Sequence, residues 1–126
     1  MARKSENYKG IPNQQLFVQL SFLIIQNLGG IASTKEIRKG VLEILNPTDD
    51  VLKVRSNTYR GYEFTHKLSY ARTCMHNCGV LTNPEPGKEI WTVTPEYSDR
   101  KELTYEECCV LTNKGPTLRS PNSKNA

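Results

Sequence analysis

The sequence predicts a small α+β domain in which a helix leads into two short strands joined by a polar connection. Apolar residues recur at intervals of three and four from Phe64 to Cys78, which indicates the buried face of a helix. Gly79 follows at the position where glycine ends a helix in a left-handed conformation. Two runs rich in β-branched and aromatic residues come next, at 80–82 and 90–94, with the polar segment 83–88 between them. This order is typical of a winged helix-turn-helix, which has a three-helix core and a β-hairpin wing.

A first helix is expected from about Asn13 to Leu28. Asn13 is a suitable N-cap, and the Gly29-Gly30 pair ends the periodic stretch with an abrupt change of direction. Four apolar residues share one row of this helix: Leu16, Leu20, Ile24 and Leu28. Phe17 and Leu23 lie beside this row.

The second helix has the clearest start signal in the chain. Ser33 and Glu36 form a capping box, in which each side chain satisfies a backbone N–H that the first turn leaves unpaired. A very short strand at Ile31-Ala32 precedes this helix, and Asn46-Pro47 ends it. The residues expected to be buried are Ile37, Val41, Ile44 and Leu45.

The chain divides into three parts around these elements. Residues 1–12 are expected to be a flexible arm, 13–97 the winged-helix domain, and 98–126 a partly ordered extension and tail. The connection 48–62 is long for a helix-turn-helix, and its segment 51–54 is either a helical turn or a strand. A further helix is expected over 103–111.

Composition and charge narrow the class of protein. At 126 residues with 37% apolar content, the chain has the size of one domain. No apolar run is long enough for a membrane span, and the first ten residues lack the apolar region of a signal peptide. We therefore expect a cytoplasmic protein with reduced cysteines. The net charge is +4, and eight Lys and Arg against five Asp and Glu between 33 and 79 suit contact with a polyanion, although an ordinary solvated surface has the same appearance.

The segment 28–37, Leu-Gly-Gly-Ile-Ala-Ser-Thr-Lys-Glu-Ile, resembles the start of the amino-terminal winged-helix domain of Mrr-type restriction endonucleases. Residues 70–73 (Tyr-Ala-Arg-Thr), 78–84 (Cys-Gly-Val-Leu-Thr-Asn-Pro) and 91–94 (Trp-Thr-Val-Thr) are similar to the recognition helix and wing of that family. The resemblance covers about residues 13–97. It implies a DNA-binding domain that helps to choose the target, including modified DNA, beside a PD-(D/E)xK nuclease domain that cuts it.

The sequence departs from this family after the wing. Only residues 98–126 follow it, too few for the nuclease domain, and the nearest match to the nuclease motif is Asp99-Arg100-Lys101, a short match that arises easily by chance. No nucleophile elbow or phosphate-binding loop is present, and the two histidines, His66 and His76, lie on one expected helix. We therefore expect no enzymatic activity, no catalytic residue and no cofactor.

The helix that starts at Phe64 is expected to lie in the major groove of double-stranded DNA. Side chains that suit base edges lie on its outward side: His66, Ser69, Tyr70, Thr73 and Asn77. Two cationic side chains flank its apolar stripe: Lys67 and Arg72. Phosphate contacts are expected from side chains of the second helix, the long connection and the wing tip: Lys35, Arg38, Lys39, Arg60 and Lys88.

Several readings of function remain open. The acidic wing residues Glu85 and Glu89 and the modest charge favour a winged helix that binds a protein or pairs as a homodimer without binding DNA. If DNA is bound, the chain is either a regulator or the recognition part of a restriction or defence system with a separate nuclease subunit. The cysteines indicate no metal, because Cys74 and Cys78 lie one helical turn apart on the apolar side and Cys108-Cys109 are adjacent.

Overall fold

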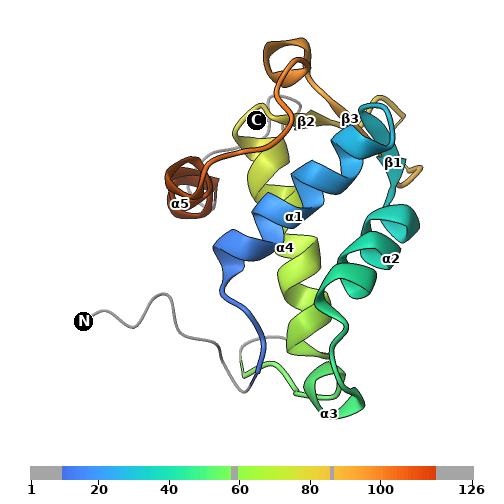
Figure 1. Cartoon of the computed structure of the whole chain (residues 1–126), viewed down its shortest axis with the longest axis vertical. Helices are drawn as coiled ribbons and strands as arrows, with labels where there is room; N and C mark the ends of the chain where they lie inside the picture. The colour runs from blue at the N-terminus through green and yellow to red at the C-terminus, as the bar shows by residue number, and fades with distance from the viewer. Residues whose placement is uncertain (1–9, 58–59, 86, 116–126) are drawn as a thin grey trace.

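The computed structural model describes residues 10–57, 60–85 and 87–115, which form an α+β domain with five α-helices and a three-stranded antiparallel sheet (Figure 1). In chain order the elements are α1 (Gln14–Asn27), β1 (Ile31–Ser33), α2 (Thr34–Leu45), α3 (Asp49–Leu52), α4 (Glu63–Asn77), β2 (Leu81–Thr82), β3 (Ile90–Val93), the 3-10 helix η2 (Pro95–Tyr97) and α5 (Tyr105–Lys114). Most of the expected arm and the tail 116–126 lie outside the described residues, and Ile11 is fully buried in the core. None of the described helices has the length and apolar character needed to cross a membrane.

Helix α1 packs against α2, α4 and α5. Its N-cap is Asn13, as predicted, and the Asn13 side chain accepts the backbone N–H of Leu16. The buried residues are Phe17, Val18, Ser21, Phe22, Ile24 and Ile25. Of the row that the sequence shows, only Ile24 is buried: Leu16 and Leu20 are half-buried and Leu28 is 49% exposed, whereas Phe17, beside the row, is fully buried. Apolar side chains occur nearly all round this helix, so their spacing alone does not identify the buried face.

The capping box of α2 is confirmed, with both reciprocal bonds of Ser33 and Glu36 present. Ile37 and Val41 are buried as predicted. Ile44 is 51% exposed, contrary to the prediction, because α1 and α2 diverge toward the carboxyl end of α2 (Figure 1). Near the middle of α2 the helices approach closely: a Cβ added at Gly40 would lie 2.8 Å from the Ile24 side chain.

The connection between α2 and α4 contains one short helix and one β-bridge. The segment 51–54, left open between helix and strand, lies partly in α3, whose N-cap Thr48 accepts the Val51 N–H. Arg55 then pairs with Tyr62 in an isolated antiparallel bridge, and the Arg55 guanidinium lies 5.1 Å from the centre of the Tyr62 ring. This bridge closes the connection at the residue where α4 begins.

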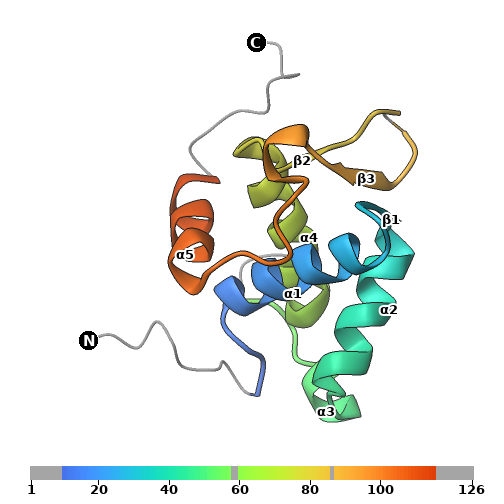
Figure 2. The same cartoon turned by 45° about the horizontal axis from the view of Figure 1, so that its top comes forward.

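Helix α4 lies behind α1 in both views and leads into the sheet (Figures 1 and 2). It buries Phe64, Leu68, Ala71, Cys74 and Met75, whereas Cys78, expected on the buried face, is half-buried. Gly79 follows with φ +83°, the left-handed conformation that the sequence predicts. The strand order is β1-β3-β2, with Ala32 opposite Trp91 and Leu81 opposite Val93.

Helix α5 contributes to the same core as α1, α2 and α4. Thr104 and Glu107 form its capping box, and Arg100 also donates to the Glu107 carboxylate. Cys108 and Leu111 are buried with Leu103 in the core, and α5 packs on both α1 and α4. The helix occupies Tyr105–Lys114, whereas the sequence predicted 103–111.

Candidate nucleic-acid interface

The outward side of α4 carries a row of hydroxyl groups. Thr65, Ser69 and Thr73 are exposed and recur every four residues, so their side chains lie along one side of the helix. The Thr73 hydroxyl donates to the Ser69 carbonyl oxygen at 3.2 Å. Ser69 and Thr73 were predicted from the sequence. Thr65 was not, although it lies one helical turn before Ser69.

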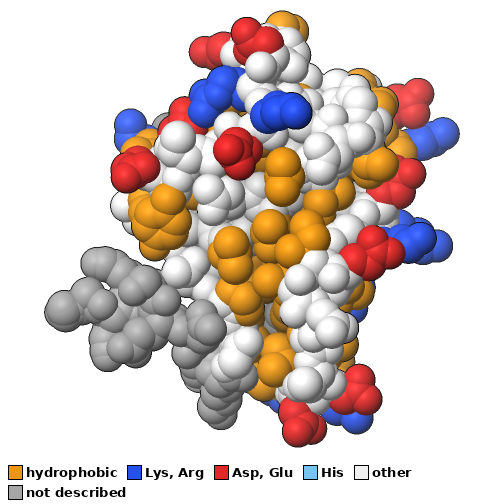
Figure 3. Space-filling view, in the orientation of Figure 1, with side chains coloured by type: hydrophobic (Ala, Val, Ile, Leu, Met, Phe, Trp, Pro, Cys, Tyr) orange, Lys and Arg blue, Asp and Glu red, His pale blue; other side chains and the backbone are white. Residues whose placement is uncertain are grey.

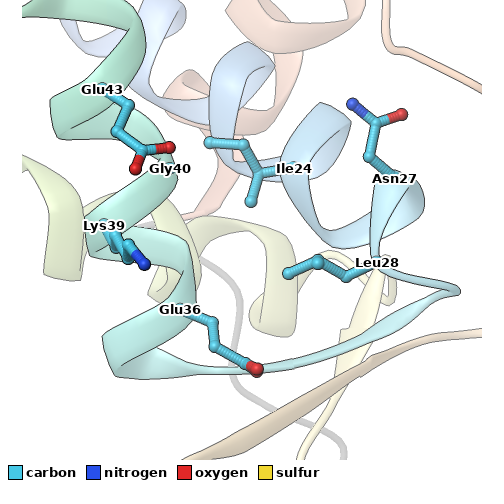
Figure 4. Close-up of a pocket in the computed structure, with 7 residues that line it drawn as sticks. All are labelled: Ile24, Asn27, Leu28, Glu36, Lys39, Gly40 and Glu43. Atoms are coloured by element: carbon cyan, nitrogen blue, oxygen red, sulfur yellow. The ribbon is translucent and has the colours of Figure 1, made fainter.

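Helix α2 places a guanidinium group beside the first turn of α4. Arg38 donates from Nη1 to the Thr65 hydroxyl at 3.3 Å, so the two helices meet at the start of the hydroxyl row. Lys35 is exposed one turn earlier on α2. Lys39 lines one hollow of about 410 Å³ together with Lys35 and Arg38, and another between α1 and α2 together with Glu36 and other residues of both helices (Figure 4).

The β2–β3 connection, which is the wing, lies beside the amino end of α2. Lys35 and Lys88 line one hollow of about 490 Å³ between the amino end of α2 and the β2–β3 connection. Lys88 Nζ also lies 3.8 Å from the Glu85 carboxylate, and both side chains are about two-thirds exposed. Glu89 lines the same hollow, so the cationic character of the wing is partly neutralised.

Trp91 connects the wing, α2 and α4. Its indole N–H donates to the Thr34 hydroxyl at 3.0 Å, and its ring lies 5.9 Å from the His76 ring in an edge contact. The Arg72 guanidinium lies 5.9 Å from the centre of the Trp91 ring. Neither Trp91 nor Thr34 was predicted as a site residue, although a single tryptophan on an expected wing strand was a usable signal.

Arg72 lies at the edge of the core between α4 and the wing. Burial lowers the pKa of its guanidinium, and the nearby Glu89 carboxylate offsets part of that change. Its Nη1 donates to the Leu68 carbonyl oxygen at 3.4 Å, while its buried Nε has no partner among the described residues. Because arginine stays charged in proteins, Arg72 keeps a cation beside the hydroxyl row.

Three predicted base-reading side chains lie on a different side of α4. The His66 and Tyr70 rings stack at 5.9 Å, and Asn77 donates to the Gly115 carbonyl oxygen at 3.0 Å at the end of α5. These residues lie about 80–100° around the helix axis from the hydroxyl row, because successive residues of an α-helix are 100° apart. Asn77 therefore attaches α5 to α4, whereas the stacked rings of His66 and Tyr70 form a second group beside the hydroxyl row.

The two remaining predicted cations are separated from this row. Lys67 is half-buried, burial lowers its pKa, and its carbonyl oxygen accepts a bond from Gln14 of α1 at 2.8 Å. Arg60 is exposed in the connection before α4. The structure thus brings Arg38 to the start of the hydroxyl row, Arg72 to the wing and Lys35 to Lys88. The predicted residues His66, Lys67, Tyr70 and Asn77 lie at other angles around α4.

The arrangement offers a row of hydroxyl groups with Arg38 at its start and Arg72 near its other end, which is chemistry for hydrogen bonding to a polyanion. Within the described ranges no three His, Cys, Asp or Glu side chains gather to hold a metal ion. A scan against protein-family models and searches of curated proteins and of solved structures found no match to this chain.

Proposed function

We propose that this chain is a winged helix-turn-helix protein that binds double-stranded DNA. The order of helices and strands supports this fold, since α1, β1, α2, α4, β2 and β3 follow one another with one short helix, α3, inserted before α4. The central position of β3 between β1 and β2 supports it too, because the β2–β3 connection then forms a wing beside α2.

One observation carries the proposal: Arg38 donates to Thr65 at the start of the exposed row of Thr65, Ser69 and Thr73, and Trp91 of the wing contacts Arg72 and His76 near the other end of α4. A helix about 10–12 Å wide fits the major groove of B-DNA, which is about 12 Å wide. Hydroxyl groups donate to and accept from base edges, whereas lysine and arginine contact phosphates and set the register. In this arrangement Lys35 and Lys88, which line one hollow, contact the phosphate backbone on the same side of the inserted helix.

The resemblance to Mrr-type domains adds a biological setting to the proposal. The chain acts as the recognition part of a cytoplasmic restriction or defence system, with cutting supplied by a separate nuclease subunit, or as a regulator that uses the same DNA contacts. A comparison of methylated and unmethylated duplexes separates these settings, since a preference between them supports a restriction role.

Fluorescence anisotropy with a labelled duplex pool tests DNA binding. Affinity should fall by orders of magnitude between about 50 and 200 mM salt if several phosphates are contacted. Arg38→Ala should weaken binding to all sequences alike and reduce the salt slope by about 1. Lys101→Ala is the matched control, because it removes an exposed positive charge from the connection before α5 and should leave the slope unchanged.

Substitutions in the hydroxyl row test whether these side chains recognise the base sequence of the DNA. Ser69→Ala and Thr73→Ala should change the preference between duplex sequences with little change in salt slope. Equal weakening on every sequence would mean that these hydroxyls do not contact bases. If Arg38→Ala leaves the affinity for DNA unchanged, α2 is not part of the interface.

The acidic wing favours a second candidate, an interaction module that binds a protein. Glu85 pairs with Lys88, and Glu89 lies near Arg72. Two of the four cations of the proposed interface therefore have an acidic neighbour; the four are Lys35, Arg38, Arg72 and Lys88. Absence of binding to any duplex at low salt would support this candidate over the first.

A further inference from the structure

The cations of the proposed interface belong to separate elements of the fold. Figure 3 shows the face over α1, where hydrophobic and uncharged side chains fill the middle and Lys and Arg lie toward the edges. Lys35 and Arg38 come from α2, whereas Lys88 comes from the wing. Lys88 can therefore act together with the α2 cations only while the wing keeps a fixed place beside α2.

The backbone holds the wing to the rest of the domain over a short distance. Ile90 pairs with Ser33 of β1, and the Thr34 N–H donates to the Glu89 carbonyl oxygen at 2.9 Å. On the other side, β2 pairs with β3 through the two residues 81 and 82. Two-stranded pairing is at best marginally stable in water, so side-chain contacts at the base of the wing are needed to fix its direction.

Trp91 supplies such contacts to two helices at once. Its indole N–H donates to the Thr34 hydroxyl at the start of α2 at 3.0 Å. Its ring meets the His76 ring edge-on and lies 5.9 Å from the Arg72 guanidinium, both on α4. A tryptophan side chain combines a large apolar ring with one directional donor, so these contacts fix both the place and the rotation of the ring.

We infer that Trp91 is a positioning residue of the DNA-binding surface, which holds the wing so that Lys88 and Lys35 contact the phosphate backbone together. This role rests on the proposed function. The two lysines line one hollow of about 490 Å³ between the wing and α2, and Trp91 donates to α2 beside it. A loop that is already fixed in its bound arrangement does not pay the entropy of ordering when the ligand binds.

The expected size of the effect follows from the release of counterions. Each contacted phosphate adds about 0.9 to the slope of log affinity against log salt concentration. Over the tenfold range from about 1 to 0.1 M salt, one contact therefore changes the affinity about eightfold. Lys88→Ala should lower the affinity for a labelled duplex pool about eightfold at 0.1 M salt and reduce the slope by about 1, as measured by fluorescence anisotropy of the full chain.

The test compares this effect of Lys88→Ala in different backgrounds. Trp91→Phe keeps an aromatic ring and removes the indole N–H. In the Trp91→Phe chain, Lys88→Ala should lower the affinity less than about twofold, because Lys88 no longer has its fixed place. Thr34→Val removes the acceptor and should act in the same way. Thr34→Ser keeps the acceptor and should retain the eightfold effect, which distinguishes the hydrogen bond from the bulk of the side chain.

Thr104→Ala is the matched control for a loss of stability. It removes the N-cap hydroxyl of α5, a helix on the opposite side of α1 from α2 in both views (Figures 1 and 2). In the Thr104→Ala chain, the eightfold effect of Lys88→Ala should be unchanged. Loss of the effect there would overturn the inference, because it would then follow stability and not Trp91. Circular dichroism of each variant shows whether the fold is retained.

The outcomes separate this inference from the proposed function. If Lys88→Ala has the same effect in the wild-type and Trp91→Phe chains, or no effect in the wild type, the inference is overturned while duplex binding by the wild type still supports the proposed function. If the wild-type chain binds no duplex at low salt, both are overturned.

Discussion

The indole hydrogen bond of Trp91 is expected to hold the wing against α2 with a measurable share of the folding free energy. Trp91→Phe keeps an aromatic ring beside Arg72 but removes the N–H that donates to Thr34 at 3.0 Å. Thr34→Val removes the acceptor and keeps the shape of the side chain. A hydrogen bond of normal length contributes about 1 kcal/mol net, so each substitution should lower the free energy of unfolding by about 1–1.5 kcal/mol.

The double-mutant cycle separates the hydrogen bond from other effects of each substitution. If both side chains act through this bond, the double variant loses about as much as either single variant, and the coupling energy is about 1 kcal/mol. Urea unfolding followed by far-ultraviolet circular dichroism suits the measurement, because Trp91 is the only tryptophan and its fluorescence is lost in two of the four proteins. With a slope of about 1.5–2 kcal/mol per molar urea, each midpoint should fall by roughly 0.5–1 M.

Thr34→Ser is the control for this cycle. It keeps the hydroxyl acceptor and should retain most of the coupling to Trp91. Losses that simply add in the Trp91→Phe, Thr34→Val double variant would refute the reasoning, because the two side chains would then contribute independently.

Three further outcomes are expected. Gly40→Ala should lower the free energy of unfolding by about 1–3 kcal/mol, because the new Cβ lies 2.8 Å from the Ile24 side chain; a raised melting temperature, ordinary for Gly→Ala in a helix, would contradict this. Hydrogen bonding from Arg100 lowers the pKa of the Glu107 carboxyl from 4.5 to about 2, so its stabilisation is complete above pH 4.5 and is lost as the pH falls toward 2. The difference in unfolding free energy between the wild type and Glu107→Gln should disappear over that interval. Burial raises the pKa of the Cys108 thiol to about 12, so native protein at pH 8 should leave Cys108 unmodified by iodoacetamide in peptide mass analysis, and rapid alkylation without unfolding would contradict its burial.

The features that the sequence predicted best are the local ones, which involve only residues close together in the chain. The capping box at Ser33 and Glu36, the N-cap at Asn13 and the left-handed Gly79 are all present. Each depends on residues a few positions apart, so no knowledge of distant contacts was needed. For the same reason the helix and strand positions were predicted to within a few residues, which supports an α+β fold.

The features that the sequence did not predict depend on which surfaces meet. The side of α4 that carries Asn77 is attached to α5 by the bond to Gly115, 38 residues later in the chain. Helical periodicity gives the angle between side chains but not the neighbour that each one faces. The outward set was therefore predicted as one group, whereas the structure separates Ser69 and Thr73 from Tyr70 and Asn77.

The packing of α1 on α4 fixes the surface that the proposed DNA contact uses. The Phe17 and Phe64 rings meet edge-on at 5.0 Å in the core, so the orientation of α4 is set relative to α1. Helix α1 also packs on α2, which donates from Arg38 to the Thr65 hydroxyl. Because both helices pack on α1, the hydroxyl row and its nearest cation keep one arrangement.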